Sequence, residues 1–371
     1  MRRLRMAMIG GGPGAFIGPV HRFAAELDRE IELVAGVFSS DADRSRAAGD
    51  SYRIDPARAY PSLDAMFAAE AAREDGIDFV AIVTPNHNHL PSARAALAAG
   101  LPVITDKPLT ATLAEAHDLA EVVEAAGKPF GVTYTYSGYP LVREARARIA
   151  AGEIGTIRKV VVEYPQGWLA GEAVGKQAEW RVDPSRAGLG GCIGDIGVHA
   201  FQLAEFVTGL RVTELLADLG AVVPGRLLDD DCSILLRFDN GARGVLLASQ
   251  IEVGELNGLR IRAYGEKGGI VWKQEVPNTL TVHRLDGRTE IVHAGGSQIG
   301  PDAASRTRTP TGHPEGYLEA FANLYRDFAA LVRGEQAPLL PGIADGVRGM
   351  TFIATAVAAS RDRAGWVKLE G

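Results

Sequence analysis

A short apolar stretch that runs into a cluster of glycines constrains the fold of this chain most strongly. Residues 4–9 predict a buried strand, residues 10–14 read GGGPG, and residues 17–27 have the pattern of a helix. Glycines at such a turn let the backbone bend sharply and approach a pyrophosphate, which then faces the N–H groups of the helix N-terminus. The loop is longer than in the plain G-x-G-x-x-G pattern, so an ordinary glycine-rich turn is the alternative to a dinucleotide site.

Further strand and helix signals alternate through the first third of the chain. Residues 31–38, 79–84 and 103–105 predict buried strands, and the Ala-rich residues 63–72 and 91–99 predict helices between them. Buried strands that alternate with helices are typical of a parallel, doubly wound sheet. We therefore expect an α/β domain of the Rossmann type over residues 1–128.

Longer strands of alternating hydrophobicity begin after this domain. Asp239-Asn240-Gly241 is a strong hairpin turn between two of them, and the polar residues 295–311 predict a long loop. We expect a mainly antiparallel, open-sheet α+β domain over residues 129–371. The predicted strands are 158–164, 232–238, 242–249, 279–285 and 289–293, and the predicted helices are 142–151, 199–207, 314–332 and 344–359.

Length and composition limit the classes of function. The 371 residues suggest two domains, and 46% hydrophobic with 23% charged residues is ordinary for a globular protein. The formal net charge of −7 argues against a nucleic-acid partner and against an anionic membrane surface. Cys192 and Cys232 have neither disulfide-framework nor zinc-ligand spacing. Because we find no export signal and no bilayer-length apolar run, the sequence predicts a cytoplasmic protein.

The end of the second predicted strand bears on the choice of cofactor. A dinucleotide-binding fold usually has an acidic residue there for the ribose hydroxyls, but this chain has Ser39 and Ser40, followed by Asp41 and Arg44. A missing carboxylate removes the repulsion against a 2′-phosphate, and Arg44 would attract one. The alternative for Arg44 is a solvated helix residue, so these residues leave NAD and NADP both open.

Later motifs indicate a family. Residues 84–89 (TPNHNH) follow one predicted strand and residues 106–108 (DKP) follow the next. Residues 180–181 (WR) and 190–199 (GGCIGDIGVH) come later, followed by residues 265–269 (GEKGG) and 275–278 (EVPN). In this order the motifs resemble those of the glucose–fructose oxidoreductase / inositol dehydrogenase / MocA family, and the resemblance covers nearly the whole chain.

The resemblance implies a Rossmann domain followed by a mostly antiparallel sheet domain, and homodimers or homotetramers formed through that sheet. It also implies that the last helices pack on the first domain and that the cofactor is NAD, with NADP as the alternative. The chain departs from the family pattern at Asp106, which replaces a Glu, and at residues 133–137, which replace an Asn-x-Arg segment. The implied cofactor-binding residues are Gly10, Gly12, Pro13, Gly14, Ala15, Phe16, Ile17, Ser39, Ser40, Arg44, Thr84, Asn86, His89, Asp106, Lys107, Trp180 and Arg181.

Lys107, Asp195 and His199 match the catalytic group of the family. Asp195 and His199 are four residues apart in a helical pattern, so their side chains are expected to share a face. Oxidation of an alcohol needs a base and a group that stabilises the developing alkoxide. Neutral His199 suits the base, Lys107 suits the cationic donor, and Asp195 suits a neighbouring substrate hydroxyl. Read without the family, the alternative is that Asp195 is a satisfied capping residue and His199 a surface histidine.

Four further residues are candidates for substrate contacts. Tyr136 and Arg181 belong to segments near the family's substrate site, and Arg181 is otherwise a surface ion-pair residue. Trp168 suits an aromatic wall for a sugar ring, although core packing explains it equally well. His313 precedes Pro314, which suits a first helical turn, so we expect His313 to reach a substrate hydroxyl of the same or a neighbouring subunit. A capping or solvent-facing role is the alternative for His313.

Three functions remain after this reading. The first is an NAD(P)-dependent dehydrogenase that acts on a ring polyol, either an inositol such as scyllo- or myo-inositol or an aldopyranose. The second is an NADPH-dependent reductase of a keto-sugar, and the third is a dinucleotide-binding sensor without catalysis. Lys107, Asp195 and His199 are all present, which favours an enzyme. No metal site is expected, because His87, His89 and Asp106 lack ligand spacing.

Overall fold

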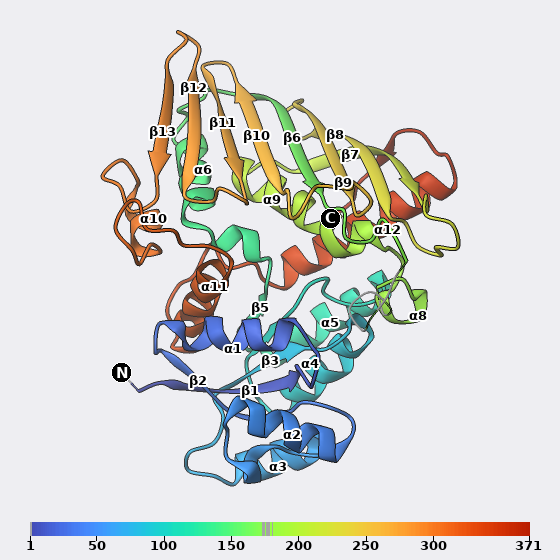
Figure 1. Cartoon of the computed structure of the whole chain (residues 1–371), viewed down its shortest axis with the longest axis vertical. Helices are drawn as coiled ribbons and strands as arrows, with labels where there is room; N and C mark the ends of the chain where they lie inside the picture. The colour runs from blue at the N-terminus through green and yellow to red at the C-terminus, as the bar shows by residue number, and fades with distance from the viewer. Residues whose placement is uncertain (1, 173–174, 176–178, 180) are drawn as a thin grey trace. The chain divides into compact units, whose positions relative to one another are not determined.

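The computed structural model describes residues 2–172, 175, 179 and 181–371, which form two compact units. The first unit comprises the described residues within 1–134, 175–180 and 321–347. The second comprises those within 135–174, 181–320 and 348–371. Figure 1 labels most of the helices and strands of both units.

Within the described part of the first unit, five strands form a parallel sheet in the order β2-β1-β3-β4-β5. Every residue of β3 is buried, as expected for a strand with both faces covered by helices. This sheet confirms the parallel, doubly wound fold that the alternating signals predict. The strands are β1 (Leu4–Gly10), β2 (Ile31–Val37), β3 (Phe79–Val83), β4 (Val103–Thr105) and β5 (Phe130–Val132), and the helices are α1 (Ile17–Leu27), α2 (Ala42–Tyr52), α3 (Leu63–Ala71), α4 (His89–Ala98) and α5 (Leu113–Ala126).

A late helix completes the core of the first unit. The part of α11 (Tyr317–Val332) from Phe321 onward belongs to this unit, and its Phe328 packs on Phe79 of β3 with ring centroids 5.2 Å apart. Tyr325 of the same helix meets the buried His21 of α1, with 2.7 Å between the hydroxyl and Nδ1. Burial lowers the pKa of His21 to about 4, so this imidazole is neutral at physiological pH.

In the second unit, a nine-stranded sheet is described in the order β13-β12-β11-β10-β6-β9-β8-β7-β14, and β6 with β9 is the one parallel pair among its described strands. The hairpin predicted at Asp239-Asn240-Gly241 joins β8 to β9, and Gly241 adopts a φ of 84°. The result confirms a mostly antiparallel second sheet. The strands are β6 (Ile157–Pro165), β7 (Val212–Gly220), β8 (Asp231–Phe238), β9 (Arg243–Ser249), β10 (Arg260–Gly265), β11 (Gly268–Lys273), β12 (Thr279–Arg284), β13 (Thr289–His293) and β14 (Val367–Lys368).

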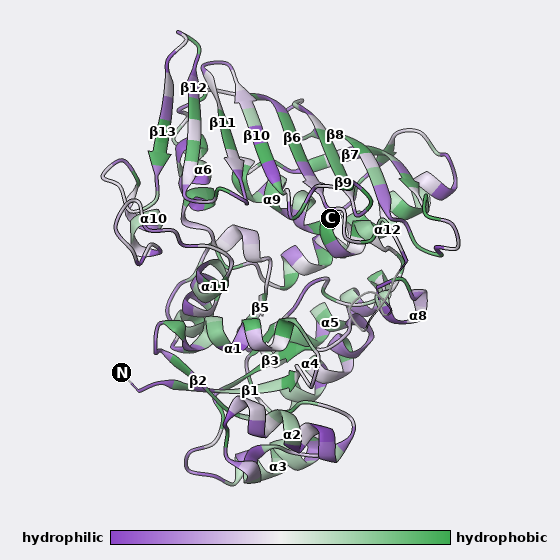
Figure 2. Ribbon diagram, viewed as in Figure 1, coloured by the Kyte–Doolittle hydropathy of each residue, from purple (hydrophilic) through white to green (hydrophobic). Residues whose placement is uncertain are grey.

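Helices cover one face of this sheet. In Figure 1, α6 (Pro140–Ala150) and α9 (Val198–Thr208) lie across the strands, and Figure 2 shows hydrophobic stretches along β6 and β8. The side chains that alternate with the buried ones point to the opposite face, where they are half-buried or exposed. None of the described helices is both long enough and apolar enough to cross a membrane.

Two sequence expectations about the segment before α11 are wrong. The helix begins at Tyr317 and not at Pro314, because the Gly316 amide donates to the Glu319 carboxylate at 2.8 Å and Glu315 accepts from the Thr309 amide at 2.6 Å. These contacts hold residues 313–316 outside the helix. The predicted loop 295–311 contains a short helix, α10 (Pro301–Ser305), which starts at a proline.

Candidate functional site

The glycine loop between β1 and α1 packs so tightly that side chains are excluded. A Cβ on Gly12 would overlap the carbonyl oxygen of Phe38 at the end of β2. A Cβ on Gly18 would lie 2.5 Å from the Gly11 Cα and 2.6 Å from the Tyr52 hydroxyl. That hydroxyl donates a 2.6 Å hydrogen bond to the carbonyl of Gly11, which fixes the loop against α2. The glycines are therefore required by the geometry of the loop itself.

The start of α1 has the properties of an anion site. In the described first turn of α1 no acidic residue occurs, and the side chain at its N-cap, Phe16, makes no capping hydrogen bond. Pro13, Gly14 and Phe16 are exposed, and Ala15 and Ile17 are half-buried. A helix N-terminus of this kind favours a negatively charged group such as a pyrophosphate. These residues fit a dinucleotide.

The end of β2 presents hydroxyls and a cation. Ser39 is half-buried, and its Oγ accepts from the Asp41 amide at 3.2 Å. The Asp41 carboxylate in turn accepts from the Arg44 amide at 2.8 Å. Asp41 is therefore the N-cap residue of α2, and its carboxylate oxygen is engaged with the helix. Ser40 and Arg44 are exposed.

The loops after β3 and β4 are joined by the imidazole of His89. This side chain is buried, and its Nε2 lies 2.9 Å from the Thr84 carbonyl oxygen. Its Nδ1 lies 3.0 Å from the carbonyl oxygen of Pro108 and 3.3 Å from that of Leu109. Burial lowers the pKa of His89, while Asp106 and the three carbonyls oppose that shift. The ring thus links two loops, and its contact with a ribose stays a prediction.

Lys107 follows β4, at the edge where parallel strands of a Rossmann sheet place their ligands. Its amide donates to Asp106 Oδ1 at 2.9 Å, and the Thr133 hydroxyl donates to the same oxygen at 3.0 Å. Lys107 is half-buried, and Asn86 of the neighbouring loop is buried. The first unit therefore gathers the glycine loop, Asn86 and Lys107 at the carboxyl ends of its strands.

Asp195 lies in a π-helical turn, Ile193–Gly197, which continues into α9. Such turns are rare and occur often at functional sites. Asp195 Oδ2 accepts from Arg181 Nε at 3.1 Å and from Gln250 Nε2 at 2.9 Å. Gln250 comes directly after β9 and is buried, and no feature of the sequence singles it out. The carboxylate is held by two donors from separate segments of the second unit.

His199 lies in the first turn of α9 and is largely buried. Its ring meets that of Tyr136 edge-on, with centroids 4.8 Å apart. The hydroxyls of Tyr136 and Tyr164 share a hydrogen bond, and burial raises the pKa of both phenols. Both therefore stay neutral near pH 7.

A chain of hydrogen bonds extends from these tyrosines to an exposed indole. Asn257 Oδ1 accepts from the Tyr164 hydroxyl at 2.8 Å and from Gln166 Nε2 at 2.7 Å. Gln166 Oε1 accepts from Trp168 Nε1 at 2.8 Å. Trp168 is 43% exposed, and the Arg181 guanidinium lies 5.8 Å from its ring centroid. Arg181 thus contacts both Trp168 and Asp195, so the second unit places an aromatic surface near a carboxylate.

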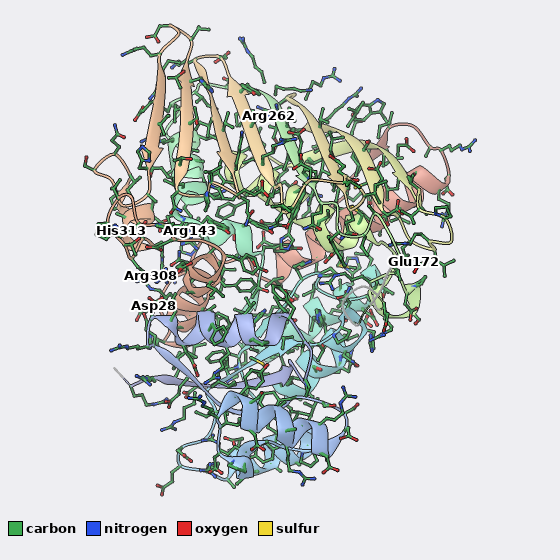
Figure 3. All side chains as sticks on the ribbon, in the orientation of Figure 1. Asp28, Arg143, Glu172, Arg262, Arg308 and His313 are labelled. Atoms are coloured by element: carbon green, nitrogen blue, oxygen red, sulfur yellow. The ribbon has the colours of Figure 1, made fainter. Side chains whose placement is uncertain are left out.

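Trp180 and His313 complete the set of predicted site residues. Trp180 is outside the described residues. His313 is exposed, its Nδ1 lies 3.2 Å from the Pro310 carbonyl oxygen, and Figure 3 shows it beside α10. A substrate contact from His313 stays a prediction. Among the side chains that the structure describes, no group of three or more His, Cys, Asp or Glu is arranged to hold a metal ion.

Comparison with family models decides the relationship. Residues 4–134 match the model of an oxidoreductase family with an NAD-binding Rossmann fold, and residues 142–271 match the GFO/IDH/MocA C-terminal domain. The chain belongs to the GFO/IDH/MocA oxidoreductase family. The resemblance seen in the motifs is therefore confirmed, and so is the Rossmann fold followed by a mostly antiparallel sheet.

Three relatives of this GFO/IDH/MocA protein are informative. The uncharacterized oxidoreductase YfiI of Bacillus subtilis is 35% identical over 99% of this chain and 97% of its own. Levoglucosan dehydrogenase of Pseudarthrobacter phenanthrenivorans is 29% identical over 76% of each chain. The crystal structure of an inositol dehydrogenase homologue from Azotobacter vinelandii, complexed with NAD⁺, is 38% identical with a TM-score of 0.94 over 99% of this chain and 97% of that one.

Proposed function

We propose that this protein is an NAD-dependent dehydrogenase that oxidises a secondary or anomeric hydroxyl of a ring polyol, either an inositol such as myo- or scyllo-inositol or an aldopyranose. The arrangement of Asp195, Arg181 and Trp168 carries the proposal. A held carboxylate accepts hydrogen bonds from several hydroxyls, while an exposed indole suits the C–H face of a sugar ring. The relatives named for levoglucosan and inositol support this class of substrate.

Each of the three proposed catalytic residues has a separate role. Bound NAD would accept a hydride from the substrate carbon. His199 takes the proton of the hydroxyl, and the Lys107 ammonium donates to the same oxygen and stabilises its developing negative charge. Asp195 accepts from a neighbouring hydroxyl and orients the ring. The two donors on Asp195 support this role, because they fix the carboxylate in place.

NAD is proposed over NADP as the physiological cofactor. The NAD-binding Rossmann model and the NAD⁺ complex of the Azotobacter homologue support it. The hydroxyl of Ser39 suits a ribose, although it does not repel a 2′-phosphate as a carboxylate would. A cytoplasmic location stays a prediction.

Gly12→Ala is expected to weaken NAD binding by about tenfold or more, because the added methyl group overlaps the Phe38 carbonyl and displaces the loop. Titration calorimetry with NAD measures the effect. Gly171→Ala is the matched control, since no atom of the described residues lies within 4 Å of the Cβ it adds. An affinity of Gly12→Ala equal to that of the control would contradict the assignment of this loop to the cofactor.

We further propose that the open face of the second sheet joins subunits into a homodimer or homotetramer. Leu216, Leu235, Val245 and Val161 lie in register on four adjacent strands and alternate with buried neighbours, so they form an apolar row on the uncovered face. Leu235 is 45% exposed. Apolar rows of this kind are typical of subunit contacts.

Leu235→Glu is expected to reduce the oligomer to a smaller species, because it places a charge in the centre of the apolar row. Light scattering after size-exclusion chromatography gives the mass. Leu285→Glu, at a hairpin turn and 81% exposed, is expected to leave the mass unchanged. A wild-type protein that is already monomeric would exclude the proposed interface.

The experiment for the function is an initial-rate assay of cofactor reduction. Inositol stereoisomers and D- and L-aldopyranoses are tested, each with NAD and with NADP. Turnover of one cyclitol or pyranose supports the dehydrogenase, and the ratio of the two cofactors decides the role of Ser39 and Arg44. Activity only in the reverse assay, with keto-sugars and NADPH, points to a reductase. NAD binding without turnover in either direction points to a sensor.

A further inference from the structure

The loop between β7 and β8 supplies a carboxylate to the start of the turn that carries Asp195. Asp229 Oδ1 accepts from the Gly191 amide and Oδ2 accepts from the Ile193 amide, both at 2.7 Å. The Cys192 amide donates to the Asp229 backbone carbonyl at 2.8 Å. The three successive amides of residues 191–193 therefore donate hydrogen bonds to one residue, Asp229, which is 36 to 38 positions away in the sequence.

This contact replaces the cap that a helix normally takes from its own N-terminal residue. The first amides of a helical segment have no partner within it, and a side-chain oxygen usually satisfies them. The residue at the N-cap of the π turn, Cys192, makes no side-chain capping bond. Gly191 is required for the approach of the loop, because its Cβ would overlap the Asp229 carbonyl and lie 2.9 Å from the Leu228 Cβ.

We propose that Asp229 is a positioning residue of the dehydrogenase: its ionised carboxylate fixes the π turn, and thereby holds Asp195 and His199 where they meet the substrate. This inference rests on the proposed function and deepens it. The link is direct in sequence, because Asp195 is two residues from Ile193 and His199 lies in the first turn of the helix that continues the π turn. Removal of the charge would free the first turn without touching the substrate.

The groups around Asp229 make its charge sensitive to pH. Burial and the adjacent Asp230 raise the pKa of Asp229 to about 6, against the two amides, which lower it. The Cys192 thiol and Asp195 are the titratable groups of the facing turn. Below this pKa one carboxyl oxygen carries a proton and accepts poorly from an amide.

Protonation of Asp229 changes the stability of the fold with pH, and the sign of this change tells a loss of positioning apart from global unfolding. The pKa of Asp229 is higher in the folded chain than its ordinary value of 3.8, so this group stabilises the fold increasingly as the pH falls from about 6 to about 4. Loss of activity over that interval through Asp229 would therefore occur without global unfolding.

The chain offers a matched control in the next residue. Asp230 accepts from the Val222 amide at 2.7 Å and from the Val223 amide at 2.9 Å, and it is buried. It thus makes the same pair of bonds from the same loop, but to residues that do not carry the proposed catalytic groups. Asp229→Asn and Asp230→Asn both remove one charge and leave one amide oxygen as acceptor.

The test is the pH profile of kcat for the wild type and both variants. Wild-type kcat is expected to fall on the acid side with a logarithmic slope that rises above 1, to about 1.5, because His199 takes one proton and protonation of Asp229 lowers the rate about tenfold further. Asp229→Asn is expected to lower kcat about tenfold at neutral pH and to reduce the slope to about 1, with KM for NAD within about twofold of the wild type. Asp230→Asn keeps the wild-type slope.

Each outcome separates the two proposals. An Asp229→Asn variant with wild-type kcat and slope would overturn the positioning role, while a wild type inactive on every polyol would overturn the proposed function.

Amide hydrogen exchange on the wild type decides the role of Asp229 if the wild type is inactive on every polyol, or if Asp229→Asn fails to fold. Protection of Gly191 and Ile193, relative to intrinsic exchange, is expected to fall between about pH 7.5 and 5, while that of Gly209 at the far end of α9 stays constant. Unchanged protection at all three amides counts against the role.

Discussion

Lys107→Ala is expected to lower kcat on the best polyol by about 100-fold or more, a much larger effect than its effect on the affinity for NAD. The proposed ammonium donates to the hydroxyl oxygen and opposes the negative charge that develops as the proton leaves. That interaction is stronger in the transition state than in the ground state, so its loss lowers kcat more than it raises KM. Asp106 and Thr133 hold the backbone at Lys107 through bonds that the substitution leaves in place, so the loop should survive it.

The controls for this prediction separate charge from position. Lys128→Ala removes an exposed lysine of the same unit and is expected to leave kcat unchanged. Lys107→Arg keeps the charge but changes the shape and reach of the donor, so it should recover only part of the lost rate. Steady-state kinetics and NAD titration on the same preparations measure both effects. Near-normal turnover by Lys107→Ala would remove this residue from the mechanism.

His199→Asn is the second substitution with a large expected effect, a fall in kcat of about 100-fold or more. Asparagine keeps a polar side chain beside Tyr136 but accepts no proton at neutral pH, so the variant lacks the proposed base. The remaining rate should rise with pH, because hydroxide then competes for the substrate proton. Measurement of kcat from about pH 6 to 10 records both effects.

A matched histidine controls for the loss of an imidazole. His283 lies on β12, is exposed, and pairs with Thr289 through Nδ1 at 3.0 Å. His283→Asn is expected to have the wild-type profile. If His199→Asn keeps the wild-type rate and acid limb, the base must be sought elsewhere in the second unit, and the proposed roles of Asp195 and His199 would need revision.

Four of the five described strands of the first unit are predictable because they are short, apolar and alternate with helices, whereas β5 and α5 are not predicted. In the second unit the signal is weaker. β10 reads RIRAYG, so arginines occupy the positions that point away from the helices, and β11 begins with two glycines. Both strands belong to the sheet because of their neighbours and not because of their own propensity. The residue pattern predicts neither of these strands, and it does not predict β7 either.

In the candidate site, too, some residues are predictable from the sequence and others are not. Lys107, Asp195 and His199 are predicted from sequence motifs. The π turn that contains Asp195, however, depends on a shift of hydrogen-bond register that no residue pattern specifies. Gln250 is a polar residue after a strand, like many others, and only the folded sheet brings it to Asp195. The proline rule places a helix start at Pro314, whereas the Glu319 carboxylate starts it at Tyr317. A contact distant in sequence decided the case of Gln250, and a local side-chain bond decided where the helix starts.

The position of β6 has a consequence for the order in which the second unit is assembled. This strand, residues 157–165, pairs with β9 at residues 243–249 and with β10 at residues 260–265, whereas β8 with β9 and β10 through β13 pair with sequence neighbours. Local hairpins form early, and pairing across about 80 to 100 residues is slow. During synthesis β6 leaves the ribosome first among these strands, yet it must wait for β9 and β10 with both of its edges open. The middle of the sheet is therefore the part of this chain that is exposed longest to mispairing.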